Sequence, residues 1–416
     1  MRLMWFMVLL VLVYVFSSLV SILLEAINLK HSTSKKASIP GILEDKISDE
    51  EFERSKAYTA DKIKLGVTRS IVTLFLGLYF VMYGFRHLET FSTGATDSLF
   101  LQALLILGIL AGVFFTVSLL FRIYAVFVVE EKHGFNRTTP RLFVFDTIKS
   151  LVIAALIGTG LVWVSMWLIT TFSFWWVLLW LVFLAFELIV TWIFPIVIVP
   201  LFNKLWPLEE GSLRKRIESL AESAGFVVKR ISLMDASKRS RHSNAFFAGL
   251  GKTKKIVLYD NLLENLDENQ IAAVVAHEIG HSKLGHILRR FLLGSFIMLG
   301  MLLLAWAIVT SGILESAFGV SKVYTSMLYA LVFLSSLDFF LEPLVNGQSR
   351  KHEFEADAYS AEALGSGEHL ISALKNLAKH NLSNLNPHPV YALFNYSHPT
   401  LVERARALGI RSEPDD

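Results

Sequence analysis

Residues 150–186 read SLVIAALIGTGLVWVSMWLITTFSFWWVLLWLVFLAF, a run of 37 residues without a charged side chain. A transmembrane helix needs about 20 apolar residues to cross a hydrocarbon core of about 30 Å. The run is therefore too long for one crossing. We expect it to break near Thr170–Ser173 into two membrane helices, the second of which ends near Phe202. This stretch alone predicts a multi-pass membrane protein.

The composition of the whole chain agrees with that class. Of 416 residues, 54% are hydrophobic and 18% are charged, whereas soluble domains carry about 25% charged residues. Such a composition excludes a disordered chain and a purely water-soluble globule. The net charge of +3 argues against a nucleic-acid partner. With no cysteine in the sequence, disulfides, thiolate zinc sites and cysteine nucleophiles are also excluded.

Five further apolar runs bring the predicted number of membrane helices to about seven. The first run could instead be a cleaved signal peptide, but its 22 residues exceed the apolar core of such a peptide, so we expect it to be retained. The five runs cover residues 3–24, about 65–85, 98–121, 291–314 and 323 to about 345.

Basic residues predict the orientation of these helices. Alternate polar segments contain 33 Lys and Arg residues, whereas the segments between them contain only Arg86 and Lys322. The positive-inside rule then places the long loop and the tail in the cytoplasm, with the N-terminus outside. We expect the lipid bilayer to surround the chain and any active site in these polar segments to face the cytoplasm.

Four segments follow from this division of the chain. Residues 1–204 form the first five membrane helices, 205–288 a cytoplasmic loop domain, 289–345 the last two membrane helices, and 346–416 a polar tail. The expected fold is mainly α, with a small polar domain on the cytoplasmic side.

The loop domain is predicted to contain helices and a small three-stranded sheet. Its β-like runs are Lys229–Met234, Asn244–Leu250 and Lys255–Tyr259, the last two joined by the hairpin Gly251–Lys254. Ser212 is expected to cap a helix over 213–224 that ends at Gly225.

Two further capping boxes mark helix starts. Asp267 and Gln270 have the spacing of a capping box, which predicts a helix from Ile271 to about Ile287. The tail is expected to form a helix near 368–380, a loop with three prolines, and a short helix over 400–408 that Thr400 and Glu403 cap.

The second predicted helix of the loop contains the sequence His277-Glu278-Ile279-Gly280-His281. Histidines four residues apart differ by about 40° around a helix, so both imidazoles can bind one Zn²⁺. Glu278 lies beside them, where a carboxylate can accept a proton from an attacking water. The alternative is a pair of surface histidines on a polar helix. His286 is off the shared face, which predicts a structural or solvent-facing role.

A catalytic zinc needs a third protein ligand, and the sequence after the last membrane helix offers one. If that helix continues, Glu353 lies on one stripe with Asp338, Glu342, Asn346 and Ser349, although Pro343 and Gly347 make a bend expected there. We predict Glu353 as the third ligand, and Asp357, one turn on, as the group that orients a ligand histidine. Otherwise, the segment is the solvated, charged end of a helix.

These motifs resemble the type I CAAX prenyl protease family of integral-membrane zinc endopeptidases. The resemblance runs from the third membrane helix to the tail and keeps the order of the motifs. It rests on HEIGH at 277–281, EFEAD at 353–357, RSRHSNAFF at 239–247, EEKHGFN at 130–136, and SHP at 397–399 with Arg404.

The resemblance implies one Zn²⁺ per chain, held by His277, His281 and Glu353, with Glu278 as general base. It implies that the strand with Asn244 and Ala245 pairs with a peptide or protein substrate, which agrees with β-augmentation at an exposed strand edge. His398 and Arg404 match the family's second polar motif and are expected to stabilise the oxyanion; alone, Ser-His-Pro is a helix-entry turn. A chamber enclosed by the seven helices is also implied.

The resulting hypothesis is a zinc metalloendopeptidase that cleaves CAAX-type prenylated peptides or similar membrane-associated substrates. One rival is a heat-shock type quality-control protease, which would have four membrane helices rather than seven. Another is a metal-ion transporter. The chain ends in Glu413-Pro414-Asp415-Asp416 without an ER-retrieval signal. This ending favours a bacterial inner membrane over the endoplasmic reticulum.

Three acidic residues within predicted membrane helices need a partner or an aqueous surface, because facing lipid would cost each several kcal/mol. They are Glu187, Asp338 and Glu342. We expect them either to face a water-filled interior or to pair with a cation such as Arg69, Arg122 or Lys149.

Overall fold

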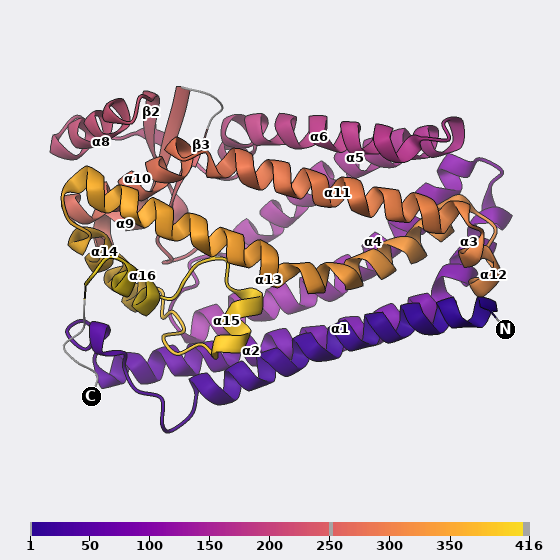
Figure 1. Ribbon diagram of the computed structural model, residues 1–416, viewed down its shortest axis with the longest axis horizontal. Coiled ribbons are helices and arrows are strands. Elements are labelled where there is room, and N and C mark those ends of the chain that lie inside the picture. The colour runs from indigo at the N-terminus through magenta and orange to yellow at the C-terminus, as the bar shows by residue number, and fades with distance from the viewer. Residues whose placement is uncertain (1, 249–252, 411–416) are drawn as a thin grey trace.

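Long, roughly parallel helices form most of the molecule (Figure 1). The computed structural model describes residues 2–248 and 253–410. Within these residues, seven helices are long and apolar enough to cross a membrane, which confirms the predicted number. The quality-control rival with four membrane helices does not fit this count.

The membrane helices extend beyond the apolar runs that predict them. Three of them contain a π-helical turn, at Phe80–Gly84, Ala125–Glu130 and Phe194–Ile198. The bounds of the seven membrane helices are α1 Arg2–Ser32, α2 Asp49–Tyr79 with α3 Phe85–Ala95, α4 Leu99–Tyr124, α5 Pro140–Thr171, α6 Trp175–Ile193 with α7 Val199–Phe202, α11 His286–Thr310 and α13 Val323–Leu364. The short α12, Ile313–Phe318, lies between α11 and α13.

The break inside the 37-residue apolar run is where the sequence predicts it. Helix α5 ends at Thr171 and α6 begins at Trp175. The turn between them is held by the indole N–H of Trp306, which donates to the Ser173 carbonyl over 3.0 Å.

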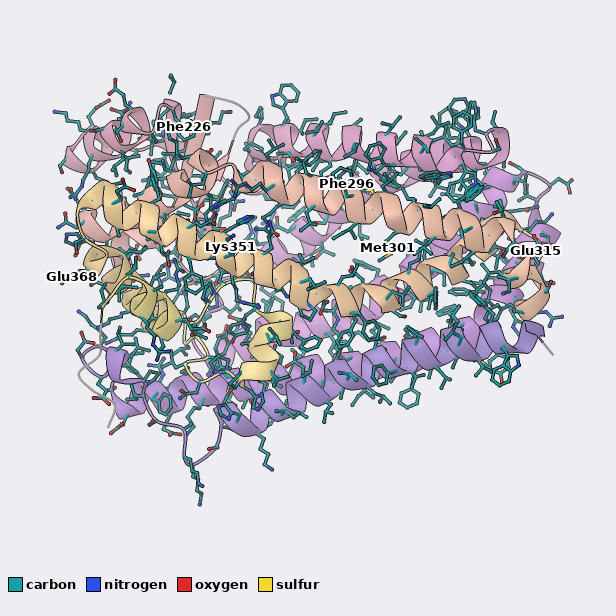
Figure 2. The ribbon with its side chains drawn as sticks, viewed as in Figure 1. Phe226, Phe296, Met301, Glu315, Lys351 and Glu368 are labelled. Atoms are coloured by element: carbon teal, nitrogen blue, oxygen red, sulfur yellow. The ribbon has the colours of Figure 1, made fainter. Side chains whose placement is uncertain are left out.

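The two ends of the bundle differ in chemistry. The N-terminus and Glu315 lie at one end, whereas the sheet and Glu368 lie at the other (Figures 1 and 2). The apolar side chains exposed along the helices between them are the surface that lipid would cover. The N-terminus is therefore opposite to the polar domain, as the distribution of basic residues predicts.

The polar domain contains four strands rather than the predicted three, in the order β1-β2-β4-β3. Strand β2 is parallel to β4, while β1 pairs antiparallel with β2 and β3 antiparallel with β4. Sequence analysis missed β1 because it is only three residues long and contains Pro207. The strands are β1 Leu205–Pro207, β2 Val227–Met234, β3 Ala245–Ala248 and β4 Thr253–Tyr259. Of the predicted hairpin connection Gly251–Lys254, Gly251 and Lys252 lie outside the described residues, and Thr253 and Lys254 begin β4.

Short helices surround this sheet and complete the tail. They are α8 Ser212–Ser223, α9 Asp260–Asn265, α10 Glu268–Lys283, α14 Glu368–His380, α15 Pro389–Asn395 and α16 Leu401–Ala407, with 3₁₀ turns at Gly41–Leu43 and Ala236–Lys238. The capping boxes of α10 and α16 are both present as predicted.

Three predictions of local structure were wrong. Ser212 does not cap α8, because its hydroxyl donates to Glu268 at 2.7 Å and Gly211 occupies the cap position. Pro389 begins a helix rather than lying in a loop, since proline fits the first helical turn. The helix with the HEIGH sequence ends at Lys283 instead of near Ile287, because Gly285 adopts a left-handed conformation with φ of 72°.

Helix α13 continues without interruption for 42 residues, through Pro343, and changes direction part-way along its length (Figure 1). A proline inside a helix removes one backbone hydrogen bond and commonly bends it. The continuation past the apolar run carries the EFEAD segment away from the membrane-spanning part and beside α10.

The three acidic side chains that the sequence places within membrane spans are exposed and make no ion pair in the part of the chain that the structure describes: Glu187, Asp338 and Glu342. The proposed cations have other contacts, since Lys149 lies 3.9 Å from Asp146 and Arg122 lies over the Phe143 ring. The helix-to-helix ion pairs considered for these three carboxylates are therefore absent among the described residues.

Candidate metal centre

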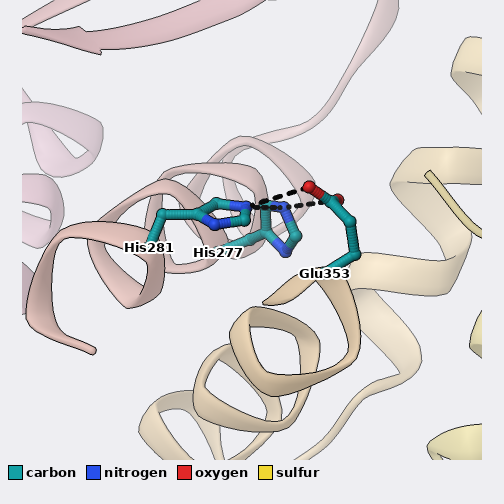
Figure 3. A group of neighbouring side chains, drawn as sticks. All are labelled: His277, His281 and Glu353. Carbon is teal, nitrogen blue, oxygen red and sulfur yellow. Dashed lines mark hydrogen bonds and ion pairs between the residues drawn. The ribbon is translucent and has the colours of Figure 1, made fainter. Parts of the chain in front are cut away.

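Helices α10 and α13 pack together and bring His277, His281 and Glu353 into one group (Figure 3). The two histidine Nε2 atoms are 3.1 Å apart. The Glu353 carboxylate oxygens lie 3.4 Å from Nε2 of His277 and 3.3 Å from Nε2 of His281. The three residues that the sequence predicts as ligands therefore converge on one point.

The other ring nitrogen of His277 is held by Asp357. Nδ1 of His277 lies 2.8 Å from Oδ1 of Asp357, which is completely buried. Burial lowers the pKa of His277, but the carboxylates of Asp357 and Glu353 outweigh it and raise the pKa to about 9. Asp357 thus orients the ring so that Nε2 points at the common site, as predicted for it.

Arg404 is buried next to Asp357 and His277. Its guanidinium donates from Nε and Nη2 to the two Asp357 oxygens over 2.8 and 2.5 Å. Nη2 also lies 3.5 Å from Nδ1 of His277. This bidentate contact differs from the expected oxyanion role, because the side chain is only 8% exposed and acts on the site through Asp357.

His398 lies on the open side of the group. Its Nδ1 is 2.8 Å from a Glu353 oxygen, and 65% of its side chain is exposed. It lies in the loop between α15 and α16, two residues before Thr400, which caps the start of α16. An exposed imidazole beside the carboxylate can donate to a substrate that enters from solvent.

Glu278 is partly buried beside the metal group. Burial raises the pKa of its carboxyl group, and the histidines around it lower the pKa in part. A carboxylate with a raised pKa is a stronger base than an ordinary surface glutamate, which suits proton transfer near neutral pH.

The sequence prediction for His286 was half right. It is not solvent-facing: only 1% of the residue is exposed, and its Nδ1 lies 3.0 Å from Nδ1 of His281. The turn at Gly285 redirects the chain and brings His286 back to His281. The glycine after the motif was the signal that could have predicted this contact.

Strand β3, with Ala245, is the edge of the sheet nearest α10. It pairs on one side with β4, and no strand within residues 2–248 and 253–410 pairs with its other side. Asn244 precedes β3, and its backbone carbonyl accepts a hydrogen bond from the Tyr259 N–H over 3.1 Å. An edge strand beside the metal group has the geometry for binding an extended peptide.

Two motifs of the sequence tie this strand to the membrane helices. Arg239 donates to Asp146 on α5 over 2.8 Å and to Asn203 over 2.7 Å. His242 lies 3.3 Å from Glu130, which also accepts from Tyr58 over 2.6 Å. The polar loop domain is thereby fixed against α2, α5 and the π-helical turn Ala125–Glu130.

Gly280 sets the distance between the two ligand-bearing helices. A Cβ atom there would lie 3.1 Å from Cδ1 of Tyr359 and 3.2 Å from the Ala356 Cα. We expect Gly280→Val to destabilise the protein by about 1–3 kcal/mol. The same change should reduce bound metal, because α10 must move from α13. Thermal unfolding and elemental analysis measure both effects. Gly94→Val, where nothing lies within 4 Å, is the matched control, and equal stability of the two variants would contradict the close-packing argument.

Comparison with known proteins places this arrangement in a family. Residues 28–204 match the family model described as CAAX prenyl protease N-terminal, five membrane helices, and residues 207–412 match that of peptidase family M48. The chain belongs to the CAAX prenyl protease family, within peptidase family M48. It is a multi-pass membrane metalloendopeptidase.

Individual members of the family match over nearly their whole length. CAAX prenyl protease 1 of Saccharomyces cerevisiae is 35% identical, with 91% of this chain and 90% of the relative covered. A CAAX prenyl protease 1 homologue from Oryza sativa is 36% identical, with 91% of this chain and 92% of the relative covered. The crystal structure of S. mikatae Ste24p superposes with a TM-score of 0.90 at 31% identity, covering 97% of this chain and 98% of the other.

The residues of the centre suit the metal that an M48 peptidase requires. Two imidazole Nε2 atoms and a carboxylate converge, and the Nδ1 atom of each imidazole has a separate partner. Such partners fix the tautomer that leaves Nε2 free to bind a metal. The donor set is one that Zn²⁺ uses in catalytic sites, with a position left for a reactant.

Proposed function

We propose that this enzyme is a zinc endopeptidase that cleaves CAAX-type prenylated peptides or similar membrane-associated substrates at the cytoplasmic face of its membrane. The observation that carries the proposal is the convergence of His277, His281 and Glu353 next to a free strand edge, at the polar end of seven membrane helices. The curated relatives are CAAX prenyl proteases, which supports the substrate class.

The roles of the residues follow from their positions. When bound, Zn²⁺ would act as a Lewis acid that polarises the scissile carbonyl. The free edge of β3, with Asn244 and Ala245, binds the substrate as an added strand. The Glu278 carboxylate accepts a proton from the attacking water and later gives it to the leaving amine.

The remaining polar residues support this chemistry from two sides. His398, exposed beside Glu353, donates a hydrogen bond to the developing oxyanion. Arg404 holds Asp357, and Asp357 holds His277, so Arg404 is a positioning residue in this proposal. The basic loops favour a site that faces the cytoplasm, and we propose a bacterial inner membrane as the location, or the endoplasmic reticulum if the protein is eukaryotic.

The test is hydrolysis of a farnesylated CAAX peptide by the purified full-length protein in detergent or liposomes. The same peptide without the farnesyl group and a soluble unfolded protein are the comparison substrates. Cleavage of the farnesylated peptide that a zinc chelator abolishes is the expected result. Cleavage of the unfolded protein alone would replace the substrate proposal with quality control.

Zinc binding should depend on pH through His277. Since its pKa is raised to about 9 in the metal-free protein, zinc must displace a proton from it at pH 7. We expect this one proton to make the apparent zinc affinity rise about tenfold per pH unit between about pH 7 and 9. Chelator competition at several pH values, with calorimetry in two buffers, measures the affinity and the proton release. A pH-independent affinity would contradict the assigned proton.

A further inference from the structure

A second group of metal-binding side chains lies next to the first. It consists of His286 on α11 and of His352 and Glu355 on α13. One nitrogen of each imidazole and one Glu355 oxygen lie within 4.8 Å of one another. The His286 nitrogen nearest the carboxylate is Nε2, which is 2.8 Å from Oε2.

Rigid elements hold all three residues. His352 and Glu355 are three residues apart on α13, so they share one face of that helix. His286 begins α11, directly after the turn at Gly285. The two imidazole rings stack with their centroids 4.2 Å apart and an angle of 8° between their planes, so one ring must turn about its Cβ–Cγ bond for the in-plane lone pairs of both to reach one cation.

This group has a buried atom without a partner. His352 is 2% exposed, and its Nδ1 makes no hydrogen bond within the described part of the chain. A buried polar atom left unpaired costs about 1–3 kcal/mol, so its presence in a folded protein calls for an explanation. A bound cation would give this nitrogen a partner. Glu355, whose side chain is 33% exposed, provides a path from solvent.

We propose that His286, His352 and Glu355 form a second site for a zinc-class divalent cation. Two imidazoles and one carboxylate match the donors that Zn²⁺ and Co²⁺ prefer. Arg289 and Lys351 lie 3.9 Å from Glu355, and their positive charges weaken binding at this site. Both side chains are largely exposed and can turn into solvent when a cation binds.

Metal bound in the second site disturbs the zinc ligand His281 of the first site. This step rests on the proposed zinc site. With its Nε2 on the first metal, His281 carries its proton on Nδ1 and donates it to Nδ1 of His286, 3.0 Å away. His286 then keeps its own proton on Nε2 and donates it to Glu355. A metal on Nε2 of His286 moves that proton to Nδ1, where it faces the N–H of His281. The hydrogen bond is lost, and the second metal becomes inhibitory.

The experiment counts metal ions bound to the full-length protein. Holoprotein with one zinc is dialysed against increasing Zn²⁺ or Co²⁺, and bound metal is measured by elemental analysis. The wild type should bind a second, weaker equivalent and lose activity by about fivefold or more as it binds. His352→Phe keeps the stacked ring but no ligand atom, so it should bind one equivalent and resist inhibition. Glu355→Gln should also lose the second equivalent.

Two further variants make the outcome specific. His369→Phe, which alters a histidine outside both groups, should keep two equivalents. His277→Ala should lose the first equivalent and keep the one that His352→Phe removes, so the second site can be detected even if the proposed function fails. One equivalent at all metal concentrations in the wild type, or a second equivalent that survives His352→Phe, would overturn the proposal.

Discussion

Glu278→Gln should reduce peptide hydrolysis by about 10²–10⁴-fold, the usual contribution of a positioned general base. The amide keeps the shape of the side chain but cannot accept the proton of the attacking water. The same change should raise the Tm of the metal-free protein at pH 7 by about 1–3 °C. Loss of activity combined with a gain in stability is the signature of a residue kept for function.

The sign of the stability effect follows from the pKa. Burial raises the pKa of Glu278 in the folded protein, so the folded state binds this proton more tightly than the unfolded state. Above the ordinary pKa of glutamate, the ionised carboxylate therefore costs stability, and glutamine removes that cost. The gain should shrink as pH falls toward the ordinary pKa of glutamate and vanish below about pH 4, where both states become protonated.

The control for this prediction is Glu222→Gln, which alters an exposed glutamate on α8. It should leave both hydrolysis and Tm unchanged. Thermal unfolding and peptide cleavage of the two variants at pH 7 and pH 5 give the comparison. Full activity in Glu278→Gln would remove the general-base assignment, and a lower Tm would show that the carboxylate is stabilising instead.

Membrane helices and ligands could be predicted because each has a local signal. The apolar run 150–186 is longer than one crossing, which is sufficient to place its break. His277 and His281 are one helical turn apart, so the sequence fixes their common face. Glu353 was predictable only because α13 continues as one helix past Pro343, a condition that the sequence left open.

Other parts of the site depend on contacts between distant segments. Arg404 was expected at the oxyanion, but its partner Asp357 is 47 residues away, and no spacing shows that the two are buried together. His286 was placed away from its true neighbour because a left-handed glycine interrupts the helix. Strand β1 has too few residues to show a period of two.

The buried pair of Asp357 and Arg404 should have the largest effect on stability. Asp357→Asn leaves the guanidinium of Arg404, a residue only 8% exposed, without a counter-charge. Removing one partner of a buried ion pair costs about 3–5 kcal/mol. Because Asp357 also holds Nδ1 of His277 at 2.8 Å, zinc affinity should fall by about 10–100-fold. Thermal unfolding and chelator competition measure these two quantities separately.

A double variant separates the two roles of Asp357. In Asp357→Asn with Arg404→Met, no unpaired charge remains, so much of the stability should return. Zinc affinity should stay low, because the amide does not restore the charged partner of His277. Asp45→Asn, which breaks an exposed pair with Lys375, is the control and should cost at most about 1 kcal/mol. Recovery of zinc affinity in the double variant would mean that Arg404, rather than Asp357, governs the His277 ring.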